Sequence, residues 1–159
     1  MKADIAFIAL QGFILLFLLL HDWIPLGPFN DVTAIKSQMS IQKNIFNTFA
    51  NALPIAVALA LSASYLGKPY PLAVKIFFIL IYALFLFGEY KAWWGPYFFG
   101  ADPELVRRYQ AMFGNTHAFL PVRHGIVPNT AHVMLHLSTL LAFICAIVKF
   151  LEPSKELLR

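Results

Sequence analysis

Residues 5–20 read IAFIALQGFILLFLLL, an apolar run interrupted only by Gln11 and Gly12. A helix over residues 4–24 would match the ~30 Å hydrocarbon core of a bilayer. The run is too long for the apolar part of a signal peptide, and no small-residue cleavage site precedes His21. We therefore expect a first membrane-spanning helix that is retained in the mature chain.

Three further apolar runs follow, and each stops at residues that end helices. They predict spans at residues 44–66, 72–94 and 130–151. Glycine favours the left-handed backbone at a helix end, and proline cannot continue a helix. The predicted stops are Gly67, Gly95-Pro96 and Pro153.

Polar residues mark the expected helix starts. Ser40 is a candidate N-cap for an early start of the second span, and Asn129 for the fourth. A short amphipathic helix is expected at residues 103–113, begun by Asp102 and ended by Gly114. A helix of this kind would lie flat at a membrane surface.

The composition agrees with a small membrane protein. Of the 159 residues, 60% are hydrophobic and only 13% are charged, which argues against a disordered chain or a soluble globular domain. The 12 Lys and Arg form no basic stripe, so we expect no nucleic-acid partner. The predicted fold is an all-α integral membrane protein: a single domain over residues 1–159, with four transmembrane helices and one interfacial helix.

Four antiparallel spans would put both termini on one side, here called the terminal side, with the 67–71 turn. The other side, the loop side, would hold the loops 26–43 and 97–128. Each side carries six Lys or Arg, but those of the terminal side lie in short segments at helix ends, where the positive-inside rule is strongest. This favours the inner membrane with cytoplasmic termini, in contact with membrane lipids. The six are Lys2, Lys68, Lys75, Lys149, Lys155 and Arg159.

All five histidines and all three tryptophans fall at the loop side. Glu89 lies about one turn inside the third span, where a carboxylate is costly unless it faces the bundle interior. His132 and His136 are four residues apart and share one face of the fourth span. So complete an asymmetry indicates a site at the loop side.

Several readings of this cluster remain open. Glu89, His132 and His136 could bind a divalent metal, and haem ligation is a weaker option without an attachment motif. The same three residues, with Asp22, could act as catalytic acids and bases. A purely structural hydrogen-bonded network is the third reading. The sequence leaves open whether the chain is an enzyme.

The surrounding polar residues suggest what would bind. The long loop is expected to form an ordered cap, with Arg123 favouring an anionic head group. The expected substrate is small and amphipathic or lipid-like. The alternative is a small transporter or a structural subunit, as a homo-oligomer or in a larger membrane complex. The ligand-binding candidates are His21, Asn51, Trp93, His117, Arg123 and Asn129.

Overall fold

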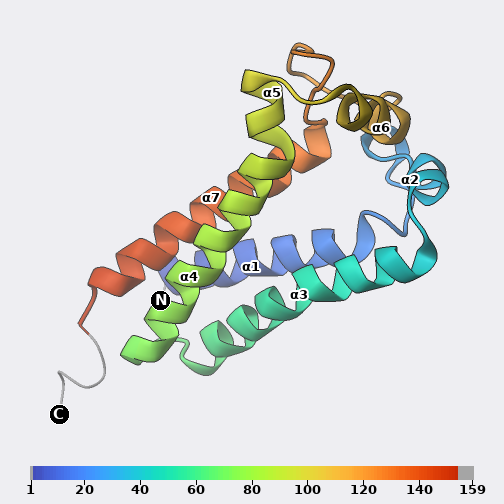
Figure 1. Cartoon of the computed structure of the whole chain (residues 1–159). Helices are drawn as coiled ribbons and strands as arrows, with labels where there is room; N and C mark the ends of the chain where they lie inside the picture. The colour runs from blue at the N-terminus through green and yellow to red at the C-terminus, as the bar shows by residue number, and fades with distance from the viewer. Residues whose placement is uncertain (1, 154–159) are drawn as a thin grey trace.

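A computed structural model describes residues 2–153, and over that range the chain forms helices and turns with no strand. Two of the orientation charges, Lys155 and Arg159, lie outside the described residues. Within this part, four helices are long and apolar enough to cross a membrane (Figure 1). The prediction of an all-helical chain with four such helices is confirmed. They are α1 (Lys2–Leu20), α3 (Ile41–Ser64), α4 (Leu72–Glu89) with its extension to Phe99, and α7 (Thr130–Leu151).

The helix starts follow from side-chain caps, as predicted. The side chain of Ser40 accepts a hydrogen bond from the backbone N–H of Lys43 at 3.3 Å, which begins α3. Asp102 caps α6 (Pro103–Phe113) in the same way, and Asn129 caps α7. Each cap satisfies a backbone donor that the first helical turn leaves unpaired.

The loop after α1 contains two short helices that the sequence analysis did not predict. They are η1 (Gly27–Phe29) and α2 (Val32–Gln38), the latter capped by Asp31. α2 packs against α6, so the two loops of the loop side cover the end of the helices together (Figure 1).

The long helices pack in the spatial order α3, α1, α7, α4. α1 contacts both α3 and α7, and α7 packs along α4. The contact between α3 and α4 is far less extensive. These two helices lie close at the turn that joins them and diverge towards the loop side (Figure 1). The bundle is therefore closed at the terminal side and open between α3 and α4 at the loop side.

The predicted stop of the third span at Trp94 is wrong. A π-helical segment, η2 (Tyr90–Trp94), follows α4 and leads directly into α5 (Gly95–Phe99). The N–H of Gly95 donates to the carbonyl of Tyr90, five residues back, so this turn is wider than an α-helical turn. The helix continues through Gly95-Pro96 because the widened turn accommodates the proline.

A contact from α6 completes this arrangement. Pro96 has no N–H to donate into the preceding turn. The carbonyl oxygen of Ala92, four residues before it, accepts a hydrogen bond from the hydroxyl of Tyr109 at 2.7 Å. The tyrosine ring also packs on Trp93, with centroids 4.7 Å apart. The short helix is thus anchored to the irregular turn.

A buried ion-pair network closes the terminal side. The Lys149 ammonium lies 2.7 Å from the carboxylate of Asp4 and 2.9 Å from that of Glu152. Lys75 donates to the backbone carbonyl of Glu152. Asp4, Lys75 and Lys149 are all buried. The sequence analysis treated these two lysines only as orientation charges, whereas the structure uses them to join α1, α4 and α7.

Replacing Asp4 with Asn should destabilise the protein. The substitution removes the carboxylate from a buried ammonium, and we expect the free energy of unfolding to fall by about 2 kcal/mol, less than for an unrelieved buried charge because Glu152 remains. Thermal unfolding in detergent measures this. The paired variant Asp4→Leu, Lys149→Met should recover most of the loss. An unchanged melting temperature in Asp4→Asn would show that the ion pair contributes nothing.

Candidate ligand site

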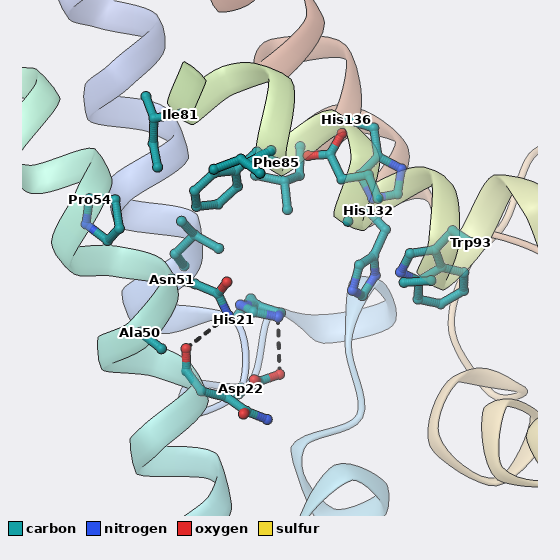
Figure 2. Close-up of a pocket in the computed structure, with 17 residues that line it drawn as sticks. His21, Asp22, Ala50, Asn51, Pro54, Ile81, Phe85, Trp93, His132 and His136 are labelled. Atoms are coloured by element: carbon teal, nitrogen blue, oxygen red, sulfur yellow. Dashed lines mark hydrogen bonds and ion pairs between the residues drawn. The ribbon is translucent and has the colours of Figure 1, made fainter. Parts of the chain in front are cut away.

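A cavity of about 500 Å³ occupies the loop-side end of the bundle (Figure 2). α3, α4 and α7 form its walls, together with the end of α1 and the turn that follows it. Much of the polar chemistry that the sequence places at the loop side converges here. Its polar lining residues are His21, Asp22, Asn47, Asn51, Glu89, His132 and His136.

The other part of the cavity wall is apolar and reaches the outer surface. Ala50 and Pro54 of α3 face Ile81 and Phe85 of α4 (Figure 2). Leu84 also lines the cavity, although it is 64% exposed on the outside of the helices. The cavity therefore opens sideways, through the gap between α3 and α4.

Glu89 reaches this cavity from the last turn of α4. It follows Lys75 and Tyr82 at seven-residue intervals, so all three lie on the inward face of the helix. Only 9% of Glu89 is exposed. Among the described residues, neither carboxyl oxygen has a hydrogen-bond partner, and the neighbouring Thr139 uses its hydroxyl on the Leu135 carbonyl. The carboxyl group is therefore available to a bound molecule.

His136 presents a second buried group without a partner. The residue is 5% exposed, and its Nδ1 atom has no hydrogen-bond partner within residues 2–153. The ring lies against Trp94, with centroids 5.8 Å apart, and lines the cavity. Glu89 and His136 thus bring two available polar groups to one space.

His132 is held differently. Its Nδ1 lies 2.7 Å from the side-chain oxygen of Asn129. The amide nitrogen of Asn129 donates to the Phe29 carbonyl and to the Thr116 hydroxyl, which fixes the amide orientation. Because the amide oxygen only accepts, Nδ1 of His132 carries the proton. In the neutral ring, Nε2 is then a hydrogen-bond acceptor.

Aromatic rings surround His132. The centroid of Trp93 lies 4.5 Å from that of His132, and the centroids of Phe113 and His21 lie at 5.2 and 5.6 Å. This packing fixes the ring plane on several sides. His132 is therefore a rigid part of the wall.

His21 and Asp22 share a proton. Nδ1 of His21 must donate to the carbonyl of Phe17, 2.9 Å away, because a carbonyl only accepts. Nε2 of the same ring lies 3.1 Å from the Asp22 carboxyl, a contact that needs one further proton between them. Burial raises the pKa of Asp22 above its ordinary value, and the His21 charge opposes that shift. The pair is a proton donor on the cavity wall.

The structure gathers most of the predicted site residues and separates three. Asp22, His21, Asn51, Glu89, Trp93, His132 and His136 line the cavity. His117 instead contacts the Thr130 hydroxyl at 2.7 Å. Arg123 stacks over Tyr97, 5.5 Å from its centroid. With Asn129 acting as a cap, these three polar residues hold the loop and are absent from the lining.

The metal prediction is not supported. Among the described residues, no group of three or more His, Cys, Asp or Glu side chains is arranged to hold a metal ion. The physical reason is visible at the expected ligands. His132 directs Nδ1 at Asn129 and is packed between rings, so it does not converge with Glu89 and His136 on one point.

Several lining residues were missed. Phe85, Gly88 and Ala92 lie four and one residues before and three residues after Glu89, and all line the cavity. Their helical spacing from Glu89 was a usable signal. No family model, curated protein or solved structure matches the chain. The chemistry of the site therefore follows from its own residues.

Replacing Glu89 with Leu should leave the protein as stable as before or raise the free energy of unfolding by about 1 kcal/mol. The reason is that a buried polar group without a protein partner costs stability. Thermal unfolding in detergent tests this, with Asp4→Asn as the destabilised comparison. A large loss of stability in Glu89→Leu would indicate a structural network.

Replacing Asn129 with Ala should lower the free energy of unfolding by about 2 kcal/mol, because the helix cap and two side-chain bonds are lost. The substitution also frees Nδ1 of His132. Nitrogen NMR of labelled imidazole should then show a change in the balance of the two ring tautomers. Asn115→Ala is the matched control, since Asn115 is exposed in the same loop. An unchanged tautomer in Asn129→Ala would contradict the assignment.

Proposed function

We propose that this chain is an integral membrane protein whose four apolar helices form a transmembrane bundle. Large apolar side chains face outwards along these helices, including Phe49 on α3, 67% exposed, and Phe87 on α4, 62% exposed. A hydrocarbon surrounding would accommodate such surfaces. On the positive-inside rule, both termini lie in the cytoplasm and the cavity is at the opposite face of the inner membrane.

α6 is proposed to lie at the interface. Its outward face carries the ion pair between Arg107 and Glu104, 2.7 Å apart and largely exposed, whereas Met112 is buried. Because a flat amphipathic helix keeps charges in water and apolar side chains inward, this arrangement suits a membrane surface.

We propose that the cavity binds a small amphipathic, lipid-like molecule. One observation carries the proposal: Glu89 and His136 bring unpartnered polar atoms to a cavity whose apolar wall reaches the outer surface between α3 and α4. A molecule with an apolar body and a polar group satisfies both halves of this wall. Entry between α3 and α4 would let it arrive from the hydrocarbon layer.

The same groups equip the site for acid–base chemistry on the bound molecule. Nε2 of His132 accepts a proton, and the His21–Asp22 pair holds one. A structural subunit is the alternative. It would pair its buried polar groups with one another, as Asp4 and Lys149 do, whereas those of Glu89 and His136 remain unpaired among the described residues. This contrast favours a ligand site.

A cavity-filling variant tests the proposal. Gly88 lines the cavity, and an added Cβ would meet nothing within 4 Å. Gly88→Leu should therefore fold normally and weaken binding of an amphiphile by tenfold or more. The probe is a brominated long-chain alcohol, whose bromines quench Trp93 at the cavity wall, with the protein in nanodiscs of uncharged phosphatidylcholine.

The matched control is Gly12→Leu. An added Cβ at Gly12 would also meet nothing within 4 Å, but Gly12 lies outside the cavity lining. This variant should bind the probe as the wild type does. Saturable quenching that is equal in Gly88→Leu and the wild type would place the probe elsewhere and contradict the proposal.

A further inference from the structure

A second cavity of about 370 Å³ adjoins the first on the side of the loops. α2, the start of α3 and α6 supply its outer walls. The two cavities share lining residues, so they meet at a common boundary. The shared residues are His21, Asp22, Asn47, Ala92, Trp93 and His132.

The second cavity is cationic. Lys43 of α3 and Arg108 of α6 both line it. Neither takes part in the ion pairs found among residues 2–153, in contrast to the adjacent Arg107, which pairs with Glu104. Asp22 is the single acidic residue among the described lining residues, and it contacts His21. Two cationic side chains therefore face this space without an acidic partner.

The two cavities differ in the character of their walls. The first has the apolar wall of Pro54, Ile81 and Phe85 and opens towards the outer surface of α3 and α4. The second has the two cations and lies beneath the loop-side helices α2 and α6. An elongated molecule that occupied both would place its apolar chain in the first and its charged end in the second.

We propose that the ligand is a single-chain amphiphile with a phosphate head group, and that Lys43 and Arg108 bind the phosphate. This inference rests on the proposed function and names its substrate class. Guanidinium and ammonium groups form charge-assisted hydrogen bonds to phosphate oxygens. The size of the first cavity suits one alkyl or isoprenoid chain.

This placement also assigns the boundary residues a position on the ligand. His132 and the His21–Asp22 pair line both cavities, so they lie beside the bond that joins chain and phosphate. Nε2 of His132 is an acceptor there, and the shared proton of His21 and Asp22 is a donor. The phosphate oxygen that carries the chain is thus the atom that these groups contact.

The experiment compares three competitors of the brominated alcohol in the same nanodiscs: dodecyl phosphate, dodecanol and inorganic phosphate. Dodecyl phosphate should displace the probe about tenfold more effectively than dodecanol, since one strong hydrogen bond to a charged group is worth roughly that factor. Inorganic phosphate should not displace it. In Lys43→Gln, Arg108→Gln the advantage of dodecyl phosphate should disappear, while dodecanol competes as before.

Arg107→Gln is the matched control, because Arg107 is the neighbour of Arg108 but lies outside both cavities. It should retain the advantage of dodecyl phosphate. Equal competition by dodecyl phosphate and dodecanol, or a double variant that matches the wild type, overturns the head-group assignment and leaves the proposed function intact. Displacement by inorganic phosphate alone also overturns it, because the anion would then bind without a chain. Failure of the probe itself to bind overturns the proposed function.

Discussion

The buried ion pair between Asp4 and Lys149 sets the conditions for the rest of this structure. It joins the terminal ends of α1 and α7, and Lys75 brings in α4 through the Glu152 carbonyl. A helical bundle that is held firmly at one end can separate at the other without losing its order. The divergence of α3 and α4, and with it the sideways opening of the cavity, depends on this closure.

Buried polar groups follow two different rules at the two ends of the bundle. At the terminal side they satisfy one another, and their cost of burial is offset within the protein. At the loop side, Asn129 and His132 are equally fixed, but Glu89 and His136 next to them are not. Since a protein that needed only stability would place apolar side chains at these two positions, the difference separates scaffold from site.

The sequence allowed the long helices and the inner face of the site to be predicted. Apolar runs identify the spans, and helical spacing brings Glu89, His132 and His136 to facing surfaces. Local patterns missed whatever depends on residues far apart in the chain. The Asp4–Lys149 pair joins opposite ends of the sequence. The placement of His117 and Arg123 depends on contacts within the folded loop.

The widened turn at Tyr90–Trp94 has a consequence for chain length. A π-helical turn corresponds to one residue inserted into an α-helix, so everything after it is rotated by about 100° from the straight continuation. That rotation lets Glu89, Trp93 and Tyr97 all remain on the buried side. The segment should accordingly accept many exchanges of one side chain for another. Loss or gain of a single residue would instead turn the aromatic groups into the surroundings and dismantle the loop side.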